Sequence, residues 1–187
     1  DICRKFKKNF PKKIELHFAN KNLGLINNVF VNSLRSYLNI TSPYFLFIEG
    51  DDYRLDKYGF QRQIDELERH TECSFCCSRT NVVIGNTLTH SFFPQIKAGV
   101  YSSYDIINKP SISYYSSLAS RIIRTKYMSI KKDEEYFALV DISQMYYLVS
   151  QSPFCFVDEV YAVYRRSGKG NSSGMSILDK CCSESQA

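Results

Sequence analysis

The chain has 187 residues, a net charge of +5, 44% hydrophobic residues and 23% charged residues. This length suits one domain with a core of its own, and the composition is ordinary for a globular protein. The longest apolar run, Tyr44–Ile48, is far shorter than the roughly 20 residues of a membrane-spanning helix. Since no segment resembles a signal peptide, we expect a cytoplasmic protein, with peripheral association at the inner face of the membrane left open.

Basic residues are unevenly distributed along the chain. One cluster lies in the first 13 residues and another follows position 164: Arg4, Lys5, Lys7, Lys8, Lys12, Lys13, Arg165, Arg166 and Lys169. Such clusters favour anionic partners, namely nucleic acid, acidic lipid or a phosphorylated small molecule. A solvated helix face is the alternative interpretation of the first cluster.

The seven cysteines are an odd number and do not form a disulfide pattern. Cys73, Cys76 and Cys77 raise the question of zinc, but a structural zinc site usually needs two well-spaced pairs. The only other close pair, Cys181 and Cys182, lies in a polar tail. We therefore expect free, mostly buried thiols.

Hydrophobic periodicity predicts alternating helices and strands. The first half of the chain is predicted to form a helix over 2–10, a strand over 13–19, a helix over 25–38, a buried parallel strand over 44–50, a helix over 59–70 and a strand over 73–85. The second half is predicted to form a helix over 102–108, a strand turning into a helix over 111–123, a helix over 133–151 and two short strands over 154–159 and 161–166. This order is typical of an α/β sandwich with a mainly parallel central sheet. Residues 173–187 are expected to be a polar, mobile tail outside the domain of residues 1–172.

Four carboxylates follow the apolar run of residues 44–48: Glu49, Asp51, Asp52 and Asp56. In open α/β sheets, ligands bind beyond the carboxyl ends of the strands. Glu49, Asp51 and Asp52 offer the hard oxygen ligands that Mg²⁺ or Mn²⁺ takes, and Gly50 would allow a sharp turn and close approach of a ligand. A surface turn whose Asp caps the next helix is the alternative.

Three segments resemble blocks of the family 2 glycosyltransferases, which have the GT-A fold. "FLFIEGDDY" (45–53) resembles their apolar run followed by D-x-D-D-[YW], with Glu49 in the first acidic place. "ANKNLGLINNVFVNSL" (19–34) is similar to their N-x-G loop and following helix. The segment from Asp141 to 173 resembles their late block, with matches at Asp141, Asp158, Glu159, Val160, Tyr164 and Arg165. The blocks occur in the family's order over roughly residues 1–172, which implies a GT-A-like, Rossmann-like fold.

The resemblance implies transfer of a sugar from a nucleotide-diphosphate donor, in the first place a UDP-sugar, to an acceptor hydroxyl with inversion. The acceptor would be a glycan, a lipid-linked molecule or a protein. Asp52, with Asp51, would hold Mg²⁺ or Mn²⁺, and Glu49 and Asp51 would bind the donor. Arg165 and Arg166 would contact the diphosphate, with residues 167–173 as a flap, and Asp141 would be the general base.

The sequence departs from the family at two places. The family's first strand and helix, and the second strand with its nucleotide-binding acid, have no counterpart before residue 1, so we expect an amino-terminally incomplete fold. Arg166, Ser167 and Gly168 stand where some relatives place a metal-binding histidine. The alternative function is therefore a non-catalytic GT-A remnant that binds sugar or a partner protein. Nucleic-acid binding is disfavoured, because the 14 tyrosines are scattered and the acidic cluster would repel phosphate.

Overall fold

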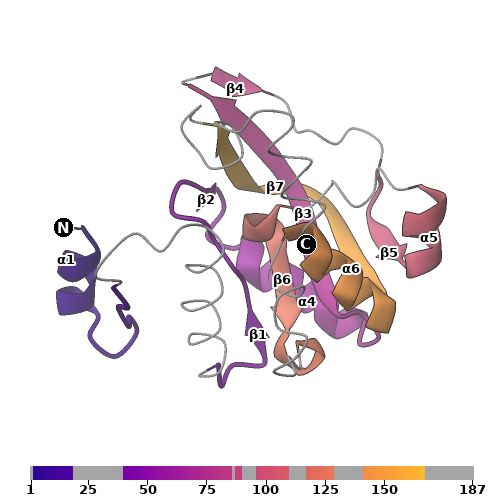
Figure 1. The fold of residues 1–187 in the computed structure, drawn as a ribbon, viewed down its shortest axis with the longest axis horizontal. Helices are drawn as coiled ribbons and strands as arrows, with labels where there is room; N and C mark the ends of the chain where they lie inside the picture. Colours follow the sequence, from indigo (N-terminus) through magenta and orange to yellow (C-terminus); the bar gives the residue numbers. More distant parts are fainter. Residues whose placement is uncertain are drawn as a thin grey trace. The chain divides into compact units, whose positions relative to one another are not determined.

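The computed structural model of the chain describes residues 2–18, 40–85, 87–89, 96–109, 117–128 and 141–166 (Figure 1). The chain divides into two compact units, Asp1–Asn39 and Ile40–Ala187. The described helix of the first unit is α1 (Ile2–Asn9). The described elements of the second unit are β1 (Tyr44–Phe45), β2 (Tyr53–Arg54), α4 (Gly59–Arg69), β3 (Phe75–Ile84), β4 (Thr87–Thr89), β5 (Gly99–Tyr101), α5 (Ser103–Asn108), the 3₁₀ turn η3 (Leu118–Ser120), β6 (Arg121–Arg124), the 3₁₀ turn η4 (Thr125–Tyr127), α6 (Asp141–Gln151) and β7 (Phe154–Arg166).

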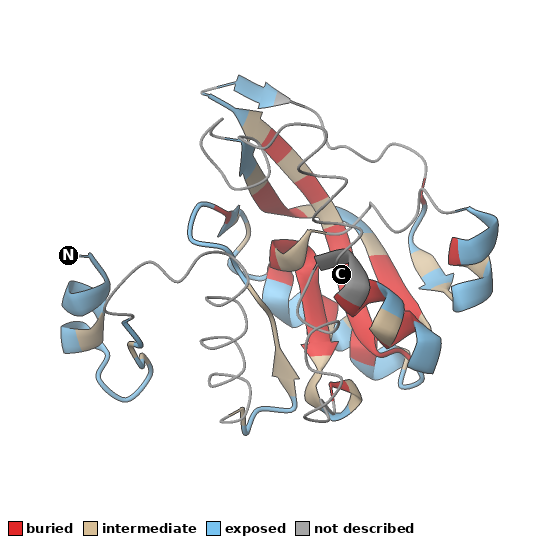
Figure 2. Cartoon of the chain, in the orientation of Figure 1, coloured by how far each residue is buried: buried red, intermediate tan, exposed pale blue. Residues whose placement is uncertain are grey.

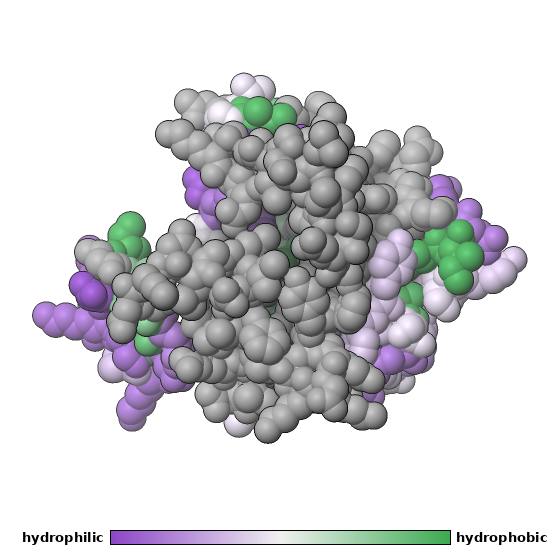
Figure 3. All heavy atoms as spheres, in the orientation of Figure 1, coloured by the Kyte–Doolittle hydropathy of each residue, from purple (hydrophilic) through white to green (hydrophobic). Residues whose placement is uncertain are grey.

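Helix α1 confirms the helix predicted for residues 2–10. Ile2, Phe6 and Phe10 recur every four residues. Lys7 and Lys8 lie in the last turn, where a positive charge interacts favourably with the helix dipole. The three apolar side chains are 74%, 50% and 47% exposed. Figure 3 shows hydrophilic surface with hydrophobic patches over this helix. None of the helices described in either unit combines the length and apolar character that crossing a membrane would require.

Two other predictions concern the first unit. The strand predicted for residues 13–19 is wrong over its described part, because residues 14–18 belong to no strand. The helix predicted for residues 25–38 lies outside the described residues.

The sheet is mixed, which corrects the prediction of a mainly parallel sheet. Its strands lie in the order β1-β6-β3-β7-β2, with β4 beside β3 and β5 beside β7. Among the described strands, only β3 and β7 pair in parallel, and the other pairs are antiparallel. The long parallel pair forms the centre of the sheet, and shorter strands extend it on both sides (Figure 1).

The apolar run at residues 44–48 is not the buried parallel strand that was predicted. Strand β1 covers only Tyr44 and Phe45, which pair antiparallel with Arg124 and Ile123 at one edge of the sheet. Both residues are half-buried. An apolar run indicates burial but not the direction of its neighbour, and this is why the prediction failed.

Strand β7 is continuous, whereas two short strands were predicted. Its pairing with β3 shifts register twice, so that Ser78 pairs with Val157, Arg79 with Val160 and Thr80 with Ala162. The extra residues on β7 form an irregularity of the β-bulge kind, which bends a strand without ending it. Polar residues 158 and 159 fall in this irregularity, which explains why the sequence suggested a break.

The remaining predictions are met in part. Helices α4 and α5 and strand β3 confirm the elements predicted for 59–70, 102–108 and 73–85, and α6 confirms the described part of 133–151. A capping box between Ser102 and Asp105 begins α5. The helix predicted toward residue 123 is wrong, because residues 118–124 form η3 and then β6. Residues 167–187, including the predicted flap and tail, lie outside the described residues.

Helices α4 and α6 cover opposite faces of the sheet. Leu67 of α4 packs in a buried cluster with Cys73, Cys76, Ile122 and Cys155. Since side chains alternate along a strand, the neighbours of these residues point to the other face. There Phe75 stacks on Phe154 with 4.8 Å between ring centroids, and Arg121 contacts Gln144 of α6. Figure 2 shows the buried residues concentrated where α4, β3, β6, β7 and α6 meet.

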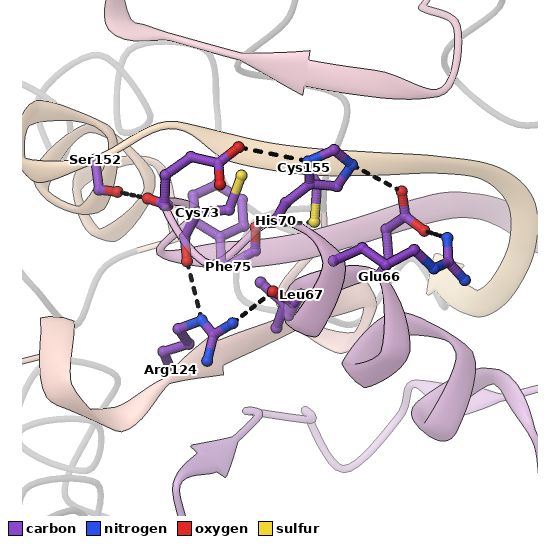
Figure 4. Close-up of polar contacts among 10 residues, drawn as sticks. Glu66, Leu67, His70, Cys73, Phe75, Arg124, Ser152 and Cys155 are labelled. Atoms are coloured by element: carbon purple, nitrogen blue, oxygen red, sulfur yellow. Dashed lines mark hydrogen bonds and ion pairs between the residues drawn. The ribbon is translucent and has the colours of Figure 1, made fainter.

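Arg124 joins α4 to the edge of the sheet (Figure 4). Its guanidinium group donates to the carbonyl oxygens of Cys73 (3.2 Å) and Leu67 and to the Tyr44 hydroxyl (3.0 Å), and it pairs with Glu68 at 3.2 Å. One side chain thereby satisfies carbonyl groups at the end of α4 and before β3. The bond to Tyr44 adds a side-chain contact to the backbone pairing of β1 with β6.

The cysteines of the sheet are buried free thiols, as predicted. Cys73, Cys76, Cys77 and Cys155 are at most 1% exposed. A hydrogen bond with Cys155, followed by burial, raises the pKa of Cys73, and burial raises the pKa of Cys77. For Cys155 the bond with Cys73 lowers the pKa, but the bond with Cys76 and burial outweigh it and raise the pKa. The raised pKa values of Cys73, Cys77 and Cys155 favour the protonated thiol in the folded protein.

We predict that stability falls as the pH rises above 9. In the unfolded chain these thiols ionise around their ordinary pKa of 9.0, whereas the folded chain keeps them protonated. Their contribution is therefore fully present below pH 9 and is lost above it, by up to about 1.4 kcal/mol per pH unit for each thiol. Urea unfolding in reductant from pH 7 to 10 measures this slope. The Cys77→Ala variant should show a shallower slope, and an unchanged slope would contradict the explanation.

Candidate functional site

The acidic residues after β1 form a tight turn. The Asp52 backbone N–H donates to the Glu49 carbonyl oxygen at 3.1 Å, which closes a four-residue turn through Gly50 and Asp51. Glu49 and Asp51 are exposed, whereas Asp52 is only 8% exposed. We call residues 49–52 the acidic turn. It presents two exposed acidic residues, Glu49 and Asp51, followed by one buried carboxylate, Asp52, and leads directly into β2.

Arg165 holds the acidic turn against the end of β7. Its backbone N–H donates to Asp52 Oδ1 at 3.1 Å, and its side-chain Nε donates to the Asp51 carbonyl oxygen. Its guanidinium carbon also lies 5.7 Å from the centre of the Tyr53 ring, within the range of a cation–π contact. Three sequence-predicted site residues, Asp51, Asp52 and Arg165, therefore lie together. The charges at this site have opposite signs, which reduces the repulsion between neighbouring carboxylates.

Arg54 anchors the other side of the turn through β2. Its guanidinium group donates to the Ala119 carbonyl oxygen at 2.9 Å and to Gln63 Oε1 at 2.6 Å. The same group lies over the rings of Phe60 (4.5 Å) and Tyr161 (5.8 Å). Burial lowers the pKa of Arg54 from its usual value.

Gln63 links the Arg54 contacts to the core. It is fully buried, and its amide nitrogen donates to the carbonyl oxygens of Cys76 (3.1 Å) and Ser120 (2.8 Å). Sequence reasoning missed both Arg54 and Gln63. Their partners lie up to 65 residues away, and no local pattern distinguishes them from surface residues.

Two glycines near the turn have different surroundings. A Cβ at Gly50 would meet no heavy atom within 4 Å, so this position is open, and Gly50 does not have a positive φ. Gly50 lies in a tight turn, as expected, but in a conformation that other residues can also adopt, and the space beside it is free. A Cβ at Gly59 would lie 2.8 Å from Tyr161 Cγ and 3.2 Å from Arg54 Nη2. The missing side chain at Gly59 thus allows α4 to pack closely against Arg54 and Tyr161.

The other predicted site residues are less closely connected to the turn. Arg166 is exposed and pairs with Ile84 at the end of β7, and Glu49 joins the site through its carbonyl oxygen. Asp141 is the first residue of α6, but its side chain lies outside the described residues. The structure therefore gives no distance between the Asp141 carboxylate and the acidic turn.

Asp158 and Glu159 form ion pairs with arginines. Both residues match the family's late block. Asp158 pairs with Arg79, and Glu159 pairs with Arg62 at 2.9 Å and accepts a hydrogen bond from the Tyr161 hydroxyl at 2.6 Å. Burial, followed by the hydrogen bond with Glu159, raises the pKa of Tyr161. These contacts lie where β7 changes register and give both acids a structural role.

The sequence predicts that the acidic turn binds a metal ion. In the part of the chain that the structure describes, no three His, Cys, Asp or Glu side chains gather closely enough to hold a metal ion. Mg²⁺, however, commonly takes only one or two carboxylates and completes its coordination with substrate phosphates and water. Asp52 and Asp51 fit such a partial set of ligands.

We predict that Gly59→Ala destabilises the protein by about 1–3 kcal/mol, because the added methyl group overlaps Tyr161 and Arg54 and overpacking costs this much. The matched control is Gly50→Ala, whose methyl group enters open space and should change stability by less than about 0.5 kcal/mol. Urea denaturation of the two variants measures the difference. Equal stabilities would show that the close approach at Gly59 is unimportant.

Comparison with known proteins gives a fold but no sequence family. The sequence matches no protein-family model and no curated protein. A crystal structure of S. aureus TarS 1–349 in complex with UDP is similar, with a TM-score of 0.61 and 16% identity, covering 90% of this chain and 48% of that one. A second structure of S. aureus TarS 1–349 gives a TM-score of 0.56 and 14% identity, covering 88% of this chain and 48% of that one.

This chain spans about half the length of the TarS chains. At such low identity the likeness concerns the arrangement of the backbone. The chain has a GT-A-like α/β fold built on a mixed sheet.

Proposed function

We propose that the chain is part of a glycosyltransferase that uses a nucleotide-sugar donor. The observation that carries the proposal is the acidic turn, where Arg165 holds Asp52 and Asp51 at the end of β7. Support also comes from TarS, a glycosyltransferase whose similar structure is in complex with UDP. A buried carboxylate beside arginine suits a diphosphate and its counter-ion, because arginine binds phosphate and the carboxylate attracts the cation.

The donor would bind at the acidic turn. The open space at Gly50 leaves room for the donor beside the exposed Glu49 and Asp51, which can accept hydrogen bonds from hydroxyl groups. Arg165 and Arg166, exposed at the end of β7, would contact the diphosphate. Arg165 would then have two roles, since the same residue also orders the turn.

Metal dependence and the catalytic base are the finer parts of the proposal. Asp52 and Asp51 would hold Mg²⁺ or Mn²⁺ together with the donor's phosphates, and the ion would neutralise charge on the departing diphosphate. Asp141 would take the proton from the acceptor hydroxyl, with inversion at the sugar. The assignment of Asp141 rests on its match to the family's late block.

We predict that the chain binds UDP in the presence of Mn²⁺ and that Asp52→Asn weakens this binding about 10- to 100-fold. The amide keeps an oxygen that can accept a hydrogen bond from the Arg165 N–H but removes the negative charge. The variant therefore tests the role of the Asp52 charge in binding while keeping the hydrogen bond that holds the turn. Isothermal titration measures the affinity. Asp65→Asn, which removes an exposed carboxylate on α4, is the control. Absence of UDP binding, or equal affinity for Asp52→Asn and the wild type, would count against the site.

We predict slow release of UDP from at least one of UDP-glucose, UDP-galactose and their N-acetylhexosamine counterparts. Asp141→Asn should lower kcat about 10²- to 10⁴-fold, because a general base contributes this much, and should leave UDP affinity unchanged. A coupled assay for UDP measures turnover. UDP binding without turnover of any donor would instead favour a non-catalytic module that binds sugar or a partner protein.

A further inference from the structure

Arg121 is the largest of the fully buried side chains that the structure describes. It lies on β6, pairs in register with Cys77 of β3 and is 1% exposed. Removing a guanidinium group from water is costly and requires polar compensation. An aliphatic residue could fill the same space without that cost, so stability alone does not explain an arginine here.

Arg121 contacts Gln144 on the inner face of α6. Its Nη1 donates to Gln144 Oε1 over 3.5 Å, which is a long hydrogen bond between two fully buried side chains. Met145 and Leu148, the neighbours of Gln144 on this helix, are also fully buried but apolar. Apolar contacts attract a helix to a sheet without fixing its rotation or its position along its axis. A directional polar contact adds that restriction.

The amide nitrogen of Gln144 strengthens this interpretation. It is buried and donates to no group among the described residues. A buried donor without an acceptor lowers the stability of the folded protein. Such groups are found where a polar side chain has a role in function or in positioning other groups. The buried amide of Gln144 therefore lowers stability further. Methionine has a similar shape and would not carry this free-energy cost, so stability alone does not explain a glutamine here.

The pair lies close in the chain to Asp141. Asp141 begins α6, and Gln144 follows one helical turn later. A displacement or rotation of α6 on the sheet would move its first residue with it. Arg121, through β6 and β3, belongs to the same sheet whose strand β7 supports the acidic turn.

We propose that Arg121 and Gln144 are positioning residues, which fix the first turn of α6 on the sheet and so place Asp141. The functional half of this inference rests on the proposed role of Asp141 as the base, whereas the structural half does not. The contact acts through the helix, since neither side chain is exposed to a substrate.

The test uses Gln144→Met, which keeps the length of the side chain and removes its polar atoms, and Gln144→Glu, which keeps an acceptor for Arg121. Met145→Leu, a buried apolar exchange on the same helix, is the control. Hydrogen exchange of peptides from residues 141–151 reports the anchoring of α6. Turnover of the UDP-sugars and the affinity for UDP report the function.

We expect Gln144→Met to speed exchange in α6 about tenfold and to lower kcat about 10- to 100-fold, with UDP affinity within about twofold of the wild type. Gln144→Glu should restore both, and Met145→Leu should change neither. A merely structural residue would lower stability without this split between kcat and UDP affinity.

A folded Gln144→Met variant with wild-type exchange would overturn the inference, and wild-type kcat would overturn its functional half. If Gln144→Met does not fold, Arg121→Lys with the same readouts decides the question, because lysine keeps the charge and loses the planar donors. If the wild type turns over no donor, the proposed function fails, and the exchange data still decide whether the pair anchors α6.

Discussion

The hydrogen bond from the Arg165 backbone to the buried carboxylate of Asp52 joins segments 113 residues apart in the chain. Asp52 is the last residue of the acidic turn, and Arg165 lies near the end of β7, the longest of the described strands, so this contact determines where the turn lies on the sheet. The Arg165 side chain adds contacts to Asp51 and Tyr53. Without these contacts, the exposed acids would have no fixed relation to the basic end of β7, and the proposed donor site would not exist.

The parallel pair of β3 and β7 provides the frame for this contact. Helix α4 covers the face with Cys73, Cys76 and Cys155, and α6 covers the face with Arg121. Arg54 and Gln63 connect β2 to α4 and to η3, so the acidic turn is held from both the helix layer and the sheet. Arg54 and Gln63 thus help to place one surface turn, which is expected where geometry matters more than stability.

The sequence allowed prediction of those elements whose pattern is local. The periodicity of α4 and the apolar character of β3 indicated them correctly, and the acidic turn was found because charges follow directly on an apolar run. The direction of β1 was not predictable, since an apolar strand looks alike beside a parallel and an antiparallel neighbour. The roles of Arg54, Gln63 and Arg121 depend on partners distant in the chain, and a single sequence does not show such contacts.

We propose that the acidic turn and the end of β7 together hold a nucleoside diphosphate. A crystal structure of the protein with UDP and Mn²⁺ would show where this ligand binds. We expect the diphosphate to lie beside Asp52 and within hydrogen-bonding distance of Arg165, with the backbone contact between these two residues intact. UDP bound elsewhere on the molecule, or an acidic turn detached from β7 in the complex, would rule out this site.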